Sequence, residues 1–212
     1  MKYKNIIWDW NGTIVNDAYL FVDIMNQTLL QHNLPLINLK KYQSSFCFPI
    51  QTYWKKLGFV FNDRSFNVLN EQFIFDYRQR MFEPKLHKNI ASVLGIIKEK
   101  GVKQFVLSAS EQKLLNKSLE YYSLSKHFTA IVGVNNLNAV GKEKKGLDMM
   151  IKHNLSENET LIIGDTEYDL NVSKALGCDC LLLSAGHFSK NRLQKLNVPI
   201  IDSVNEISSF IF

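Results

Sequence analysis

The segment Asn5-Ile-Ile-Trp-Asp-Trp-Asn-Gly-Thr13 constrains the fold of this chain more than any other stretch. Its first four residues have the pattern of a short strand that is apolar on both faces, as in the centre of a parallel sheet. Asp9 follows directly, and open α/β sheets bind their ligands at the carboxyl ends of strands. Gly12 permits a sharp turn, and Thr13 with the neighbouring N–H groups can donate to an anion. An ordinary strand followed by an Asn-Gly turn is the alternative.

The chain after Pro84 alternates between helix and strand patterns. Hydrophobic spacing predicts strands over 104–107, 129–134, 160–163, 180–183 and 198–201. It predicts helices over 87–100, 111–122, 144–154, 168–176 and 204–210, the second of them behind a Ser110 cap. This alternation implies an α/β fold with right-handed crossovers and a parallel sheet.

Residues 17–83 interrupt this alternation with helical patterns only. Helices are expected over 18–32, 39–46, 49–58 and 62–82, with Asn16 or Asp17 capping the first and Asn62 or Asp63 the last. We therefore expect a core of residues 1–16 and 84–212 with a helical insertion at 17–83. Inserted after the Asp9 turn, these helices would lie over the carboxyl ends of the strands, where a lid is useful.

Composition excludes several classes of protein. The chain has 212 residues, 46% of them hydrophobic, which suits a sizeable core. No stretch approaches the roughly 18 apolar residues of a membrane span, and the N-terminus lacks a signal-peptide pattern. Three cysteines without zinc spacing are expected to be reduced thiols in a cytoplasmic protein. The net charge of +5 suits an anionic ligand. The sequence lacks the long basic stripe with interleaved aromatics that is typical of nucleic-acid binding, so we do not expect a nucleic-acid partner.

Two further strand ends carry groups that bind anions. Ser108 closes the strand that ends in Val-Leu-Ser, and its hydroxyl with the following N–H groups forms a donor set. Lys142 follows the loop 135–141 and can supply the cation that several carboxylates and an anionic substrate require. Lys144 or Lys145 could serve instead, and a solvated lysine run is the alternative.

A third strand end, Gly164-Asp165-Thr-Glu-Tyr-Asp169, carries two carboxylates. Asp165 lies at the end of the strand and Asp169 at the start of the next helix. Two carboxylates in this position can bind a hard cation through oxygen. Capping of the helix is the alternative, but Asp9 at another strand end favours the metal site.

The ordered set Asp9-Trp-Asn-Gly-Thr13, Ser108, Lys142 and Gly164-Asp165-x-x-x-Asp169 resembles the four motifs of the haloacid dehalogenase (HAD) superfamily over nearly the whole chain. The helical block resembles the cap of phosphoglycolate phosphatase-like members. The resemblance implies a Rossmann-like parallel sheet with helices on both faces and an all-helical cap. It also implies a Mg²⁺-dependent phosphatase that acts on small phosphorylated metabolites.

The resemblance assigns roles to residues. Asp9 would be the nucleophile and form an aspartyl-phosphate. Mg²⁺ would be held by Asp9, the Asn11 carbonyl, Asp165 and Asp169. The remaining members of the set would bind the phosphoryl group, with Lys142 bridging it to Asp9: Gly12, Thr13, Ser108, Ala109 and Lys142.

One position departs from the family pattern. Family phosphatases carry an acid–base Asp two residues after the nucleophile, and this chain has Asn11 there. Hydrolysis of alkyl phosphates could be slow, the leaving group could need little protonation, or another group could substitute. A catalytically weak binding or regulatory protein is one alternative. A phosphonate-type C–P hydrolase with a cap lysine (Lys40, Lys41, Lys55 or Lys56) is another, and a dehalogenase a third.

Four other residues have two interpretations each. Trp10 could line the pocket or pack in the core, and His187 could approach the site or lie in an ordinary loop, which we favour. Arg78 and Arg80 could meet a substrate carboxylate, although a solvated helix face is expected. The substrate and the oligomeric state have no signal that we can interpret in the sequence.

Overall fold

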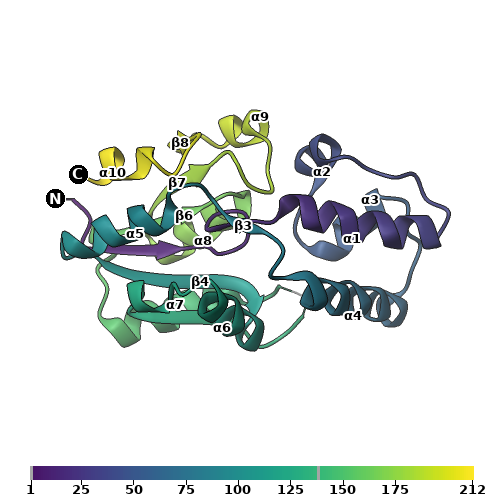
Figure 1. Cartoon of the computed structure of the whole chain (residues 1–212), viewed down its shortest axis with the longest axis horizontal. Coiled ribbons are helices and arrows are strands. Elements are labelled where there is room, and N and C mark those ends of the chain that lie inside the picture. Colours follow the sequence, from purple (N-terminus) through teal and green to yellow (C-terminus); the bar gives the residue numbers. More distant parts are fainter. Residues whose placement is uncertain (1, 138) are drawn as a thin grey trace.

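The computed structural model describes residues 2–137 and 139–212, and a six-stranded parallel sheet lies at its centre (Figure 1). β1 (Asn5–Trp8) pairs with β4 (Lys103–Glu111) on one side and β6 (Thr160–Gly164) on the other. β5 (Ala130–Val134) extends the sheet beyond β4, and β7 (Asp179–Leu183) and β8 (Ile200–Ile201) extend it beyond β6. The apolar first strand is buried along its length because it has neighbours on both sides.

Helices cover both faces of the sheet, which confirms the expected α/β fold. α5 (Ile90–Glu99), α6 (Gln112–Tyr121) and α10 (Glu206–Ile211) pack on the face to which Ile6 and Trp8 point. α7 (Lys142–His153) and α8 (Glu167–Leu176) pack on the opposite face, with Ile7. Successive residues of β1 thus contribute to opposite cores, as the period of a strand requires. α9 (Lys190–Leu193) and the 3₁₀ turns Ser125–His127, Glu157–Glu159 and Gln194–Leu196 lie in connections.

Four helices between β1 and α5 gather beyond one end of the sheet (Figure 1). They are α1 (Ala18–Gln31), α2 (Leu39–Ser45), α3 (Ile50–Lys56) and α4 (Asp63–Arg80). Their apolar cluster includes Leu20, Trp54 and Phe73, and it continues onto Leu182 of β7 and Phe188. Among the described residues, no helix combines the length and the apolar character that a membrane crossing needs.

A small antiparallel pair, β2 (Val15–Asn16) with β3 (Lys85–Leu86), joins the two chain segments that enter and leave the four helices. It was not predicted, because strands of two residues are too short to show a periodic pattern. The pair lies directly after the loop that follows β1. It therefore holds that loop and the end of the helical segment close together.

Several element boundaries differ from the prediction. α5 begins at Ile90 rather than near 87, because His87 instead donates from Nε2 to the Gly12 carbonyl at 2.9 Å and Asn89 has a φ of 67°. β4 continues past Ser108 to Glu111, with an irregular register against β5. The predicted Ser110 cap is wrong, since Glu111 is the N-cap of α6.

Candidate active site

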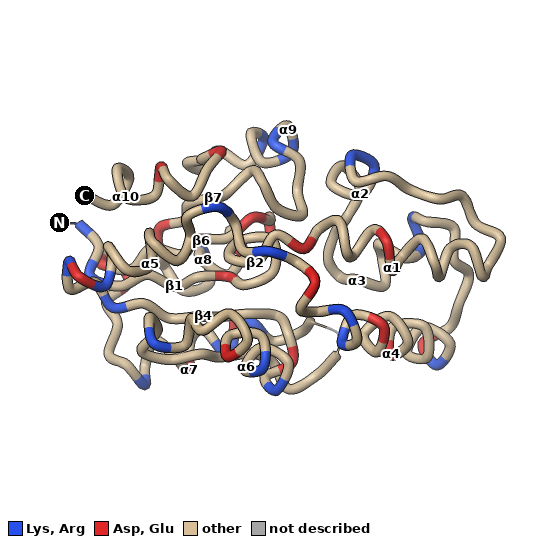
Figure 2. Tube along the Cα trace, in the orientation of Figure 1, with Lys and Arg blue, Asp and Glu red and all other residues tan. Residues whose placement is uncertain are grey.

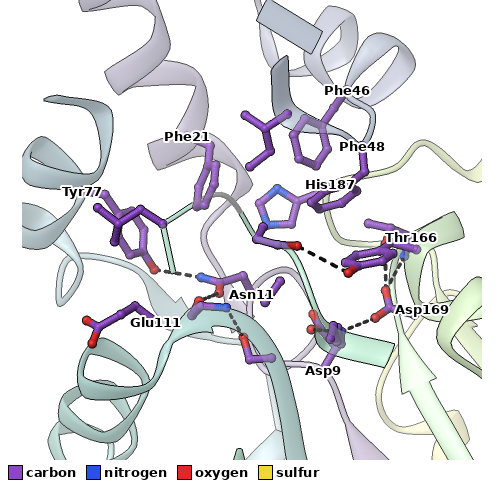
Figure 3. A pocket seen from close by; sticks show the side chains of 18 of the residues that line it. Asp9, Asn11, Phe21, Phe46, Phe48, Tyr77, Glu111, Thr166, Asp169 and His187 are labelled. Atoms are coloured by element: carbon purple, nitrogen blue, oxygen red, sulfur yellow. Dashed lines mark hydrogen bonds and ion pairs between the residues drawn. The ribbon is translucent and has the colours of Figure 1, made fainter. Parts of the chain in front are cut away.

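Three carboxylates meet at the carboxyl edge of the sheet. Asp9 follows β1, Asp165 follows β6, and Asp169 lies in the first turn of α8. All three are buried, and one oxygen of each lies within 4.8 Å of the others. Figure 3 labels two of them, Asp9 and Asp169. Asp169 is fixed by the helix start, because its Oδ2 accepts from the Thr166 N–H at 3.1 Å and the Thr166 hydroxyl at 2.8 Å. We call these residues the carboxylate cluster.

Lys142 is the cation of the cluster. It is 2% exposed, and its Nζ lies 2.5 Å from Asp9 Oδ1 and 2.6 Å from Asp169 Oδ1. Burial alone would lower the pKa of this amine, but Asp169 and Asp9 raise it above its ordinary value. α7 begins at Lys142 rather than at Lys144, and Lys144 and Lys145 do not line the cavity described below.

The cluster holds more negative charge than one lysine neutralises. Burial raises the pKa of Asp9 to about 6, against the attraction of Lys142, and burial raises the pKa of Asp165 to about 8. Burial also acts to raise the pKa of Asp169, but Lys142 outweighs it and holds that pKa below its ordinary value. Buried carboxyl oxygens in excess of the available cation are the donor set that a hard divalent ion requires. The three residues therefore fit Mg²⁺.

Two glycines allow the carboxylates to pack this closely. Gly12 has a φ of +78°, and a Cβ on it would overlap the Asp165 carboxylate and the His187 ring. A Cβ on Gly164 would overlap the Asp169 carboxylate. Any side chain at either position would displace a member of the carboxylate cluster.

A cavity separates the carboxylate cluster from the four helices. The residues of the predicted site that line it lie on the side of the sheet: Asp9, Asn11, Ser108, Ala109, Lys142, Asp165 and Asp169. Figure 3 shows aromatic side chains on the other side of the cavity. We call six of the apolar residues that line it the apolar wall: Phe21, Phe46, Phe48, Ile50, Ile74 and Leu114.

Comparison with known proteins shows the family of this chain. The family model described as haloacid dehalogenase-like hydrolase matches residues 6–183. The chain belongs to the haloacid dehalogenase-like hydrolase family. A protein named phosphoglycolate phosphatase from Haemophilus influenzae is 23% identical over 95% of this chain and 92% of its own length. One of the same name from Aquifex aeolicus is 26% identical over 88% and 87%.

A solved structure of a haloacid dehalogenase-like family hydrolase from Streptococcus pneumoniae has the same fold. Its TM-score with this chain is 0.85 at 16% identity, over 99% of both chains. This likeness supports the arrangement of the sheet and the helices described above. The predicted resemblance to the HAD superfamily is confirmed.

Both polar atoms of the Asn11 side chain have hydrogen-bond partners. Its Nδ2 donates to Asp17 Oδ2 at 2.5 Å and to the Tyr77 hydroxyl at 2.8 Å, and its Oδ1 accepts from the Ser110 hydroxyl at 2.7 Å. Tyr77 lies on α4 and Ser110 on β4, so the amide links the helical segment to the sheet. Ser110, expected as a helix cap, instead fixes the oxygen of this amide.

Asp17 is the partner that sequence reasoning missed. It is the N-cap residue of α1, one of the two predicted alternatives, but its side chain makes no capping hydrogen bond. Its side chain is fully buried, accepts from the Gly12 N–H at 2.9 Å and lies 3.2 Å from His187 Nε2. The only signal was an acidic residue amid apolar neighbours directly after the first motif.

His187 reaches the cavity, although we favoured an ordinary loop position for it. Its backbone N–H donates to Asp165 Oδ2 at 2.5 Å, and its Nδ1 lies 2.7 Å from the Tyr42 hydroxyl. Burial acts to lower the pKa of this imidazole, but the bond with Asp17 outweighs it and the pKa is raised. Its place shortly after the end of β7 was the available signal.

The structure places two predicted anion donors outside the cavity. The Gly12 N–H is engaged by the Val15 carbonyl at 2.8 Å as well as by Asp17, and the Thr13 hydroxyl donates to Asp165 at 3.2 Å. Neither residue lines the cavity, so these contacts do not support donation to a phosphate and instead support the cluster. Ser108 and Ala109 do line it.

Other candidate residues lie away from the cavity. Trp10 is 1% exposed and its Nε1 donates to the Ser118 hydroxyl at 3.2 Å, so it packs in the core. Arg80 pairs with Asp23 and Glu83 on the surface. The lysines considered for phosphonate chemistry do not line the cavity, which removes support from that alternative: Lys40, Lys41, Lys55 and Lys56.

Proposed function

We propose that this chain is a Mg²⁺-dependent phosphohydrolase of small phosphorylated compounds that uses Asp9 as its nucleophile. The observation that carries the proposal is the buried Lys142, which contacts Asp9 and Asp169 at the carboxyl edge of the sheet. Membership of the hydrolase family and relatives named phosphoglycolate phosphatase support the same reaction class. A protein that only binds its ligand has no need of a buried carboxylate with a lysine beside it.

The first step transfers the phosphoryl group. A carboxylate oxygen of Asp9 forms a bond to phosphorus, the bond from phosphorus to the leaving oxygen breaks, and the leaving group departs with the electron pair. Lys142 holds Asp9 in place and faces the phosphoryl oxygens, which Ser108 and the Ala109 N–H bind. In the second step the oxygen of water forms a bond to phosphorus, and the bond between phosphorus and the Asp9 oxygen breaks. The Asp9 carboxylate is regenerated, and the protons of the water leave on the inorganic phosphate.

Asp9, Asp165, Asp169 and the Asn11 carbonyl would hold the metal ion. When bound, Mg²⁺ supplies positive charge that reduces the repulsion between a carboxylate nucleophile and a phosphate dianion. Thr166 and the glycines beside the cluster keep the carboxylates in place. Asn11 cannot donate a proton as a carboxyl group can, so the leaving group departs without a proton from this position.

We further propose that residues 17–83 form a cap on a core of residues 1–16 and 84–212. The cavity between the carboxylate cluster and the apolar wall supports this division, because both segments line it. We place the protein in the cytoplasm, and its three unpaired thiols support that location.

Mg²⁺-dependent release of phosphate from acetyl phosphate tests the proposal. This substrate needs no proton on its leaving group, so Asn11 does not limit it. The expected result is release by the unchanged protein, its loss in Asp9→Asn, and no change in Asp148→Asn, a matched replacement of an exposed Asp on α7. Undiminished release by Asp9→Asn, or none by any protein, would contradict the proposal.

A further inference from the structure

The apolar wall gives the leaving group of a substrate an uncharged surface to contact. Phe21 belongs to α1, Phe48 to the connection between α2 and α3, and Ile74 to α4, and all three are only partly buried. Figure 3 shows Phe21, Phe46 and Phe48 on the far side of the cavity from Asp9. The Phe48 ring lies 4.7 Å from the ring of Tyr168, between centroids, and bounds one side.

Positive charge for a substrate carboxylate is scarce in the cavity. Among its described lining residues, Lys142 is the only lysine or arginine, and Asp9 and Asp169 already engage it. His187 also lines the cavity, but its Nε2 lies 3.2 Å from the Asp17 carboxylate, which engages any charge on the imidazole. Glu111 adds a carboxylate to the lining. The Arg78 guanidinium lies 3.8 Å from the Glu111 carboxylate, and Arg78 does not line the cavity. A leaving group with its own carboxylate would be repelled rather than paired.

Polar side chains around the cavity have partners within the protein. Asn11 and Tyr77 share bonds with Asp17, and the Tyr168 hydroxyl donates to Glu143 at 3.1 Å. The Asn136 amide donates to the Val140 carbonyl at 2.8 Å. A sugar would have to compete with these bonds to satisfy its hydroxyl groups, which costs free energy.

We propose that the substrate is a phosphate monoester of an uncharged aromatic hydroxyl compound, and not of a short carboxylate or a sugar. This inference rests on the phosphohydrolase function proposed above and specifies its substrate class. Two independent observations lead to it. The apolar wall favours an aromatic group, and Asn11 favours a leaving group that needs no proton. A phenol meets both conditions, since its hydroxyl ionises near pH 10 as in tyrosine, whereas an aliphatic alcohol ionises far less readily.

Four substrates separate the two conditions when the unchanged protein is assayed with Mg²⁺. Phenyl phosphate has an aromatic group and a good leaving group, benzyl phosphate only the aromatic group, acetyl phosphate only the good leaving group, and phosphoglycolate neither. The expected kcat/KM is highest for phenyl phosphate and at least about 100-fold lower for phosphoglycolate. Benzyl phosphate should keep a KM as low as that of phenyl phosphate but have a lower kcat. Phosphoglycolate turned over as well as phenyl phosphate would overturn the inference.

Two substitutions locate the preference in the apolar wall. Phe48→Ala and Ile74→Ala are each expected to raise the KM for phenyl phosphate about tenfold and to change that for acetyl phosphate less than twofold. Phe75→Ala is the matched control, because Phe75 neighbours Ile74 on α4 but is 55% exposed and outside the cavity lining. Equal losses on both substrates in both wall variants would contradict a selective role for the wall.

Binding measured without turnover separates this inference from the proposed function. Calorimetric titration with phenylphosphonate and with phosphonoacetate, in the presence of Mg²⁺, compares an aromatic with a carboxylate ligand. The inference predicts at least about tenfold tighter binding of phenylphosphonate. That preference without phosphate release from any substrate would leave the pocket assignment standing and reject the phosphohydrolase. Phosphate release from acetyl phosphate, together with equal binding of the two ligands or tighter binding of phosphonoacetate, would support the phosphohydrolase and reject the pocket assignment.

Discussion

The carboxylate cluster and the apolar wall face each other across one cavity, and they are built in different ways. Each carboxylate lies at a strand end or in the following helical turn, and each accepts hydrogen bonds from polar groups of the core. Lys142 donates to Asp9 and Asp169. Thr13 and the His187 N–H donate to Asp165. The wall instead combines side chains from several helices and connections that meet only through packing (Figure 3). Chemistry and selection of the leaving group can therefore be changed separately. Substitutions in the cluster should affect every substrate, and those in the wall only some.

Removal of the buried amine should have the largest effect. Lys142→Ala leaves three buried carboxylates without their cation, and we expect phosphate release to fall about 100- to 1,000-fold for acetyl and phenyl phosphate alike. Unfolding in urea should also show a loss of about 3–5 kcal/mol, as for a broken buried ion pair. Lys144→Ala, an exposed neighbour, is the control and should stay within about 0.5 kcal/mol. A similar loss in both variants would contradict the special role of Lys142.

A methyl group added beside the carboxylate cluster should have the second largest effect on activity. Gly164→Ala puts a Cβ onto the Asp169 carboxylate, and we expect about a 10- to 100-fold lower kcat on every substrate. Gly95→Ala is the matched change, since the nearest side-chain atom to its Cβ would be 4.0 Å away. The helix α5 should gain slightly from that alanine. Normal activity in Gly164→Ala would show that the position of Asp169 does not matter.

Exchange of the amide for a carboxyl group should affect stability. Asn11→Asp places a carboxylate against that of Asp17, which Asn11 now contacts at 2.5 Å. Repulsion and the loss of a donor should lower the free energy of unfolding by about 1–3 kcal/mol at neutral pH. The double variant Asn11→Asp/Asp17→Asn restores one donor and one acceptor, and it should recover most of this loss. Urea denaturation of the unchanged protein and of both variants measures the loss and its recovery.

The double variant Asn11→Asp/Asp17→Asn should also differ from the unchanged protein in its activity. The carboxyl group at position 11 could then protonate an alkoxide, so benzyl phosphate turnover should rise relative to phenyl phosphate. If the single and double variants are equally unstable, the Asn11–Asp17 bond is not the cause.

The smallest effect is expected at the edge of the helices. Arg78→Gln removes a guanidinium that is partly exposed and paired with Glu111 at 3.8 Å, outside the cavity lining. We expect less than a twofold change in kcat/KM for both phenyl phosphate and phosphoglycolate, because exposed ion pairs contribute about 0–1 kcal/mol. A tenfold loss confined to phosphoglycolate would mean that Arg78 binds a substrate carboxylate, and that the wall offers more charge than we infer.

Much of the sheet and the cluster could be predicted from the sequence because both depend on local order. The apolar run before Asp9 and the strand before Asp165 place two carboxylates at the same edge of any parallel sheet. Asp169 follows from helical spacing. Lys142 was chosen over two neighbouring lysines from its place beside the loop, and the first turn of α7 brings it to Asp9.

The remaining features depend on contacts between distant segments. The local pattern at Asp17 predicts only a helix cap, and only the folded chain brings His187 and Asn11 to its side chain. Thr13 lies beside the first motif, yet its hydroxyl turns to Asp165 rather than to the cavity. The apolar wall has no motif, since apolar residues at helical spacing also build ordinary cores.

A search for a phosphoryl group on Asp9 tests the proposed nucleophile most directly. Protein mixed with acetyl phosphate and Mg²⁺ is quenched in acid within one turnover and analysed by peptide mass spectrometry. We expect one phosphoryl group on the peptide that contains Asp9, absent before substrate is added and absent again once the substrate is consumed. Phosphate release with no modified Asp9, or with the phosphoryl group on another residue such as His187, would contradict it.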